Sequence, residues 1–262
     1  MKKLSFLAAM AAALVFASCG NKTDNKENGA DTVSFEQSQI EESMMNELDS
    51  LADEWSKMPH INGVLSNGKI KLSDDEIKAK PDYLMAPTAA DDLTLLSQKY
   101  RALGILAVDQ KIAELYKMDT DAYKSAIAKI ATDVNDPAAK TIDNLNAEDI
   151  KAFYTAEKEA NRINLFWEAS AASTIETLYV ISQNTDKFIT AFDDNSASKI
   201  TYEIALLKMN MDDLSKYDTN IKEIDELLAP LNKLNAINVE QLKKQLAEMK
   251  PEIEAARKGL LK

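Results

Sequence analysis

The chain has few of the residues that interrupt helices and few of those that build reactive or metal-binding sites. It contains six glycines, six prolines, one cysteine (Cys19) and one histidine (His60). A single cysteine excludes an intrachain disulfide and catalysis by a thiol pair. Neither glycine nor proline occurs between Ala138 and Ala229. Such a stretch has few positions for tight turns but is compatible with helices joined by Asn, Asp, Ser and Thr. The composition therefore predicts an all-α protein.

Basic residues are also fewer than acidic ones. Asp and Glu number 43 against 31 Lys and Arg, which gives a formal net charge of -12. A chain this acidic repels the phosphate backbone of nucleic acids, and the sequence has no basic cluster to offset the repulsion. We therefore expect no nucleic-acid partner.

The first residues have the pattern of an export signal. A positive start at Met1–Lys3 precedes an apolar run over Leu4–Phe16, and the small residues Ala17 and Ser18 follow. This order is typical of a secretory signal peptide, and the apolar run is too short to remain as a membrane-spanning anchor. We therefore assign residues 1–18 to a cleaved signal peptide.

The end of this segment indicates lipid attachment. Phe16-Ala17-Ser18-Cys19 resembles the lipobox of bacterial lipoproteins, with Phe16 where an aliphatic residue is usual. The resemblance covers the export signal only, and implies cleavage after Ser18, lipidation of the Cys19 thiol and acylation of the new amino terminus. Each buried methylene contributes ~0.8 kcal/mol, so several acyl chains hold a soluble domain at a membrane. The alternative is an ordinary signal peptide with an incidental cysteine.

The rest of the chain divides into a tether and a helical domain. Residues 19–34 comprise Cys19 and a polar stretch that predicts a flexible tether. We expect residues 35–262 to form one domain. The expected location is a bacterial cell envelope, with the outer membrane preferred and the membrane face unspecified. The expected partners are the membrane, through the lipid on Cys19, and an envelope protein or glycan.

Apolar residues at helical spacing predict an antiparallel bundle of about seven helices. The longest helix is predicted over residues 146–183, where the apolar residues of one seam are Ile150, Phe153, Ala160, Trp167, Ala171, Leu178 and Ile181. A central helix is predicted over 91–117 because it has two apolar stripes. Gly104 lies where these stripes change over and indicates a close helix crossing.

Residues 59–88 form the least regular segment of the expected domain. Asn67-Gly68 lies between short apolar stretches and predicts a small hairpin, and Ser73 predicts the cap of a short helix. A segment of this length either packs as a strap across helix ends or serves as a recognition loop. The sequence favours the strap.

Known patterns for metals and catalysis are absent from the sequence. A carboxylate-bridged di-iron bundle needs two Glu-x-x-His motifs, and His60 is the sole histidine. A Ser-His-Asp triad would require His60 on what we expect to be a mobile loop. The acidic runs at 119–121 and 193–195 lack the glycine and terminal glutamate of an EF-hand, and helix capping explains them. We predict no metal, no cofactor and no enzymatic activity.

Polar residues on the seam of the longest predicted helix form a candidate pocket. Glu157, Asn164 and Thr174 occupy seam positions, and Ser170 lies nearby. Buried polar groups of this kind fix helix register. The same residues are also suited to line a site for a small polar ligand between helices. Glu157 raises a further hypothesis of carboxylate hydrolysis, because burial would raise its pKa.

Three functions remain from the sequence, in order of preference. The first is a non-enzymatic lipoprotein that binds or spaces another envelope component. The second is a lipoprotein that binds a small ligand beside Asn164 and Ser170. The third is a hydrolase centred on Glu157.

Overall fold

The protein is all-α in the part of the chain that its structure describes. The computed structural model describes residues 35–57, 60–65, 67–143, 147–216 and 218–262. Within these ranges the chain forms twelve α-helices and four short 3₁₀-helices, without a strand. The expected signal peptide over 1–18, the lipid site at Cys19 and the tether to residue 34 lie outside the described residues.

The helices follow one another with short connections. The first half contains α2 (Phe35–Lys57), α3 (Ile61–Leu65), α4 (Asp74–Ala79), η3 (Pro87–Ala90), α5 (Leu96–Leu115), α6 (Asp121–Asp133), η4 (Pro137–Asp143) and α7 (Ala147–Glu159). The second half contains α8 (Ile163–Gln183), α9 (Thr185–Phe188), η5 (Ile189–Ala191), α10 (Asp194–Leu214), α11 (Thr219–Leu228), η6 (Ala229–Lys233), α12 (Val239–Glu248) and α13 (Lys250–Gly259).

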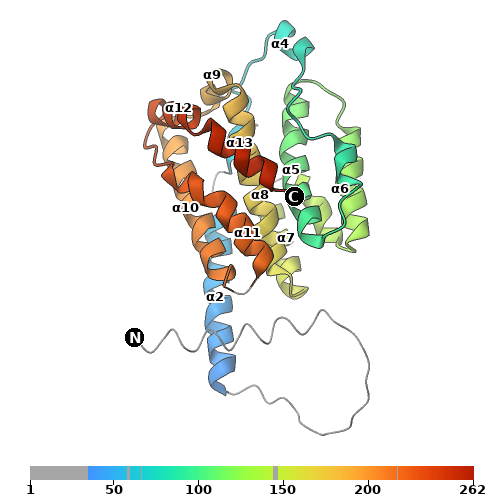
Figure 1. Ribbon diagram of the computed structural model, residues 1–262, viewed down its shortest axis with the longest axis vertical. Helices are drawn as coiled ribbons and strands as arrows, with labels where there is room; N and C mark the ends of the chain where they lie inside the picture. Colours follow the sequence, from blue (N-terminus) through green and yellow to red (C-terminus); the bar gives the residue numbers. More distant parts are fainter. Residues whose placement is uncertain (1–34, 58–59, 66, 144–146, 217) are drawn as a thin grey trace.

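Helix α8 is the element around which the others are arranged. It packs against α5 on one side and against α10, α11 and α13 on the other, while α6 packs on the far side of α5 (Figure 1). A helix covered from several sides should be apolar around its circumference. Indeed, almost every residue of α8 from Leu165 to Ser182 is buried or half-buried. The buried apolar side chains form one cluster that extends from Leu48 to Leu260.

The two central helices, α5 and α8, touch backbone to backbone at Gly104. A Cβ atom on Gly104 would lie 2.3 Å from the carbonyl oxygen of Ala169 and 2.9 Å from the amide nitrogen of Ser173. Only glycine leaves room for this approach, so the close crossing predicted from the sequence is present. All residues of α5 from Tyr100 to Gln110 are buried, which agrees with the predicted central position of this helix.

The long helix predicted over 146–183 is divided into α7 and α8. Asn161 has a φ of 56°, in the left-handed region. Arg162 donates its amide to the carbonyl of Glu157 at 2.7 Å, which closes α7 with a Schellman-type turn. Asparagine tolerates this conformation better than most residues. The apolar seam therefore continues across a turn, and breaks of this kind give twelve helices where the sequence predicted about seven.

Residues 60–65 and 67–90 form a packed strap, and this described part of the segment contains no hairpin. Val64 and Leu65 belong to α3, so the predicted pairing on either side of Asn67-Gly68 is wrong. The strap is held by Ile70 and Met85, which are both buried in the core. The cap predicted at Ser73 is confirmed, because its side chain accepts from the amide of Glu76.

Prolines and caps set the remaining helix boundaries. Pro230 lies in the first turn of η6, where α11 ends, and Pro251 lies in the first turn of α13, directly after α12. Proline is accepted there because a first-turn amide needs no helical partner. Asp193 caps α10, as expected for its acidic run. In the run at 119–121, Asp119 accepts from the amide of Asp121, but the N-cap residue Thr120 makes no side-chain bond to α6.

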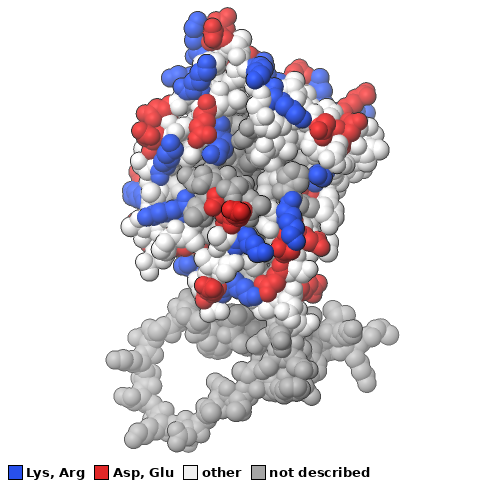
Figure 2. Space-filling view, turned by 180° about the vertical axis from the view of Figure 1, so that it is seen from behind, with Lys and Arg blue, Asp and Glu red and all other residues white. Residues whose placement is uncertain are grey.

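The surface carries charges of both signs. Lys and Arg side chains are interspersed with Asp and Glu on the face shown in Figure 2. Several are paired, such as Lys129 with Asp91 at 2.7 Å and Lys151 with Asp53 at 3.2 Å. Among the described helices, none has the length and apolar character needed to cross a bilayer.

Candidate pocket between α2, α7, α8 and α10

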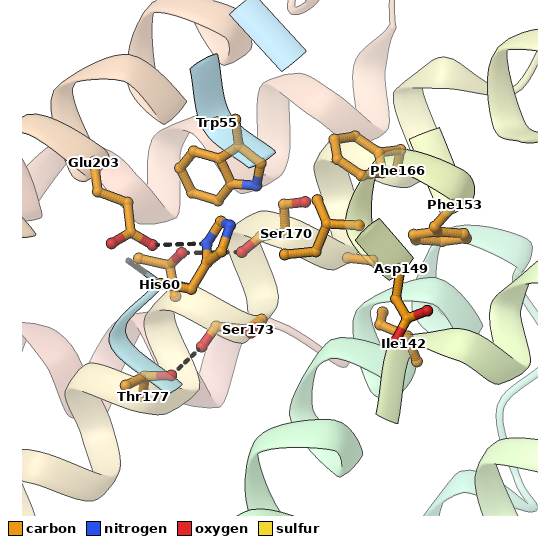
Figure 3. A pocket seen from close by; sticks show the side chains of 13 residues that line it. Trp55, His60, Ile142, Asp149, Phe153, Phe166, Ser170, Ser173, Thr177 and Glu203 are labelled. Carbon is orange, nitrogen blue, oxygen red and sulfur yellow. Dashed lines mark hydrogen bonds and ion pairs between the residues drawn. The ribbon is translucent and has the colours of Figure 1, made fainter. Parts of the chain in front are cut away.

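A small pocket lies where α2, the start of α3, η4, α7, α8 and α10 meet (Figure 3). Its cavity volume is about 30 Å³. The apolar residues in its lining are Trp55, Ile142, Ile150, Phe153, Phe166 and Ala169. The polar residues in its lining are His60, Asp149, Ser170, Ser173, Thr174, Thr177 and Glu203. A largely apolar hollow with a few polar groups is the usual form of a small-molecule site.

His60 and Glu203 form a polar contact within the lining of this pocket. The Nδ1 atom of His60 lies 3.3 Å from Oε1 of Glu203, and the Glu203 residue is only 2% exposed. Trp55 meets the imidazole at an angle of 64°, with ring centroids 5.0 Å apart. Oε2 of Glu203 and Nε2 of His60 have no hydrogen-bond partner among the described residues. The contact therefore leaves two buried polar atoms without a partner among the described residues.

Aromatic rings hold the rest of the lining in place. Phe153 and Phe166 have centroids 5.6 Å apart, and Phe153 stacks on Tyr100 at 6.3 Å. Trp55 packs edge-on against Trp167, with centroids 6.0 Å apart. Such pairs bury large apolar areas and prefer defined geometries. They fix the relative positions of α2, α7 and α8 around the pocket.

Hydroxyl groups of α8 face the same hollow. Thr174 donates its hydroxyl proton to the carbonyl of Ser170 at 3.0 Å, one helical turn earlier. Thr177 donates in the same manner to Ser173 at 2.8 Å. These bonds direct the protons to the helix backbone, so toward other groups the two oxygens can act as acceptors.

The structure brings together two of the four residues that the sequence proposed for a pocket. Ser170 and Thr174 line the hollow. Asn164 lies elsewhere, because its side-chain amide donates to Asp218 at 2.5 Å and ties α8 to the N-cap of α11. Glu157 is in a separate buried network. Glu157 lies on α7, and the other three residues lie on α8. The chain changes direction between the two helices at Asn161, so the four residues do not share one face of a single helix.

The Glu157 network is a pair of carboxyl groups between a tyrosine and an arginine. Tyr100 donates its hydroxyl to Asp136 at 2.6 Å and lies 3.5 Å from Oε1 of Glu157. The Nε atom of Arg162 lies 3.2 Å from Oε2 of Glu157. Burial, together with the neighbouring Asp136, raises the pKa of Glu157 to about 8. Burial alone would also raise the pKa of Asp136, but hydrogen bonds from Glu157 and Tyr100 bring it below its ordinary value.

The surroundings of Glu157 favour a structural role. Its residue is 0% exposed and that of Asp136 is 2% exposed, so a bulky substrate has no direct approach to either carboxyl group. A carboxyl pair that shares a proton satisfies both partners inside the core. This arrangement disfavours the hydrolase hypothesis.

Two other buried acidic networks join the central helices to each other and to the strap. Arg101 of α5 donates to Glu168 of α8 at 2.7 Å, and burial raises the pKa of Glu168 to about 7 even though the guanidinium acts in the opposite direction. Asp109 accepts from the amide of Met85 at 2.8 Å. Burial and the charge of Glu176 raise the Asp109 pKa well above its ordinary value.

Sequence reasoning missed His60, Asp149 and Glu203 as pocket residues. The three lie in distant segments and carry no motif, so only the packing of α2, α7, α8 and α10 unites them. The expectation that His60 is mobile is also wrong. Its side chain is 12% exposed and packed between Trp55 and Glu203. The sequence indicated only weakly that Glu203 is buried, because this residue lies next to Ile204 in the apolar heptad of α10.

No group of three or more His, Cys, Asp or Glu residues in the described part of the chain is placed to hold a metal ion. Comparison of the chain with protein families, with functionally described proteins and with solved structures found no match.

Proposed function

We propose that the protein is a lipid-anchored lipoprotein of a bacterial cell envelope, whose helical domain binds a small ligand without transforming it. The anchor rests on the lipobox-like Phe16-Ala17-Ser18-Cys19. The binding role rests on one observation, the pocket between α2, α7, α8 and α10 with its unsatisfied Glu203 oxygen. We place the protein at the outer membrane, with an envelope protein or glycan as a further partner.

Residues 35–262 are proposed to act as one antiparallel bundle. Support comes from consecutive helices that pack on each other across short connections, such as α5 and α6, which residues 116–120 join. Short links bring consecutive helices side by side. Such a rigid body on a polar tether would carry its pocket at a distance from the bilayer set by residues 20–34.

The anchor is tested by replacing the lipid-bearing residue. In a bacterial host, we expect the wild-type chain to pellet with membranes and to begin at Cys19 with acyl groups, as read by mass spectrometry of its N-terminal peptide. Cys19→Ser should move the chain to the soluble fraction or leave it unprocessed, because no thiol is available for lipidation. A mature wild-type chain that begins at another residue, or that carries no fatty acid, would overturn the anchor.

The binding role is tested by blocking the pocket. Native mass spectrometry of protein purified from its own envelope should show a small-molecule adduct. Ser170→Leu should remove the adduct, because the added methyl groups fill part of a cavity of only about 30 Å³. The control Ser198→Leu changes an equally half-buried serine of α10 that is outside the lining, and should retain it. An adduct that survives Ser170→Leu would place binding elsewhere.

A further inference from the structure

The pocket presents hydrogen-bond acceptors and negative charge. Its lining includes the carboxyl groups of Asp149 and Glu203 and the imidazole of His60 beside Glu203, and it includes no Lys or Arg. The hydroxyl proton of Thr174 is directed to the carbonyl of Ser170, so its oxygen faces other groups as an acceptor. A ligand that meets these groups should bring hydrogen-bond donors and a positive charge.

Glu203 provides an independent observation at one end of the hollow. Its residue is 2% exposed, and its Oε1 atom is near His60 while its Oε2 atom has no partner among the described residues. Leaving a buried carboxylate oxygen without a donor is costly. Figure 3 shows the Glu203 carboxyl group beside His60 and Trp55, with Asp149 on the opposite side of the pocket. Glu203 therefore supplies a carboxyl group to this end of the lining.

The remaining lining is suited to the body of an organic cation and unsuited to a bare metal ion. Trp55, Phe153 and Phe166 contribute ring surfaces, and aromatic faces attract ammonium groups while apolar edges pack against methylenes. A hard metal ion would require several oxygen ligands around one point. The described residues offer no group of three acidic or histidine side chains for it.

We propose that this pocket, taken as the ligand site of the proposed function, binds a small primary alkylammonium ion. Its N–H groups donate to the carboxyl groups in the lining, with Glu203 at one end, and its methylenes lie against Trp55 and Phe166. An alkylammonium group stays charged at neutral pH, as a lysine side chain does. The cavity volume of about 30 Å³ limits the enclosed part of the ligand to a few non-hydrogen atoms.

The test uses three probes of matched size and different charge. They are n-propylammonium, 1-propanol and propionate, each titrated into the full-length protein. Trp55 is in the lining and is one of two tryptophans, so its indole N–H signal in an NMR spectrum reports on the site. We expect a saturable shift with n-propylammonium, with a dissociation constant on the order of millimolar for so few atoms. The neutral and anionic probes should bind at least about tenfold more weakly.

Variants separate a specific site from general attraction to an acidic protein. Glu203→Gln keeps the shape of the side chain and should weaken n-propylammonium binding about tenfold or more, because the charged acceptor is lost. Asp149→Asn provides a second variant on the other side of the pocket. Glu240→Gln removes the same charge from an exposed position on α12, outside the lining, and should leave binding unchanged. A thermal unfolding curve for each variant verifies that it folds.

The outcomes distinguish this inference from the proposed function on which it rests. Preferred binding of 1-propanol or propionate at Trp55 would overturn the choice of a cation and leave ligand binding standing. Equal weakening by Glu240→Gln and Glu203→Gln would also overturn it, because the attraction would then be general. If no probe shifts the Trp55 signal and native protein carries no adduct, both proposals fail.

Discussion

Gly104 shows how much of this fold depends on the absence of one methyl group. The atoms that a Cβ would meet, 2.3 and 2.9 Å away, belong to the backbone of α8 and cannot rotate aside. The cost of an added side chain is therefore a separation of α5 from α8, the two central helices. The sequence indicated a close crossing at this glycine but did not identify Ala169 and Ser173 as its partners.

We predict that Gly104→Ala destabilises the protein by about 2 kcal/mol or more, since overpacking outweighs the gain of about 1 kcal/mol in helix propensity. The measurement is urea-induced unfolding followed by circular dichroism. Gly63→Ala is the control, because a Cβ at this helical glycine meets nothing within 4 Å, and it should be neutral or slightly stabilising. Equal stability of the two variants would mean that α5 and α8 separate without cost.

Asn164 is a second residue whose role depends on its neighbour. Because its amide donates to Asp218, we predict that Asn164→Leu destabilises the chain by about 1 kcal/mol and leaves pocket binding intact. Urea unfolding and titration with n-propylammonium measure the two effects. Ser170→Leu is the comparison, since it should abolish pocket binding without the loss of stability expected for Asn164→Leu. Loss of binding in Asn164→Leu would show that α11 is coupled to the pocket.

At the scale of whole elements, the turn between α7 and α8 determines where the pocket is. The two helices share an apolar seam, yet Asn161 at φ 56° ends the first and redirects the chain into the second. As a result the rings of Phe153 of α7 and Phe166 of α8 meet at a tilt of 55° beside the hollow, with centroids 5.6 Å apart. A continuous helix would have placed these rings far apart along one axis.

The turn gives a prediction for backbone conformation. Asn161→Val should destabilise the protein by about 1–2 kcal/mol, because a β-branched residue is strained at positive φ. Asn161→Gly should change stability by less than about 0.5 kcal/mol, since glycine adopts this region freely. The free energy of unfolding in urea measures both. If valine and glycine were tolerated equally, the left-handed turn would be absent in solution.

At the scale of the whole molecule, the unusual property is the number of carboxyl groups inside a helical core. Asp109, Glu157, Glu168 and Glu176 are all 0% exposed. Burial raises the pKa of each, to about 8 for Glu157 and about 7 for Glu168. A raised pKa means that the folded state binds its proton more tightly than the unfolded state. Their stabilising contribution is therefore complete below the unfolded pKa and is lost as the pH rises.

We predict that the free energy of unfolding of the wild-type chain falls between pH 5 and pH 8.5, the interval that contains the Glu157 pKa of about 8. Glu157→Gln should reduce this fall by roughly 1 kcal/mol or more, because an amide still donates to Asp136 but cannot ionise. Urea unfolding at the two pH values measures the difference. Glu159→Gln, at an exposed neighbouring position, should follow the wild type. The same pH dependence in the wild type, Glu157→Gln and Glu159→Gln would mean that Glu157 does not titrate between pH 5 and pH 8.5.

The sequence alone determined the helical class, the central position of α5 and several boundaries, because these follow from local rules. Scarce glycine and proline, the 3.6-residue apolar period, Ser73 as a cap and Pro230 as a stop are all properties of neighbouring residues. The export signal, with its lipid site at Cys19, is likewise a local pattern and stays a prediction.

Only the tertiary structure decided which polar residues meet. His60 and Glu203 are separated by most of the chain, and their contact at 3.3 Å follows from the packing of α2 on α10 and of α3 and α10 on α8. The same packing assigned Asn164 to Asp218 and Glu157 to Tyr100 and Asp136. A period of apolar residues states which face of a helix is buried, but it does not identify the helix that covers it. The pocket exists because several such faces meet around a turn at Asn161 that the apolar period by itself did not predict.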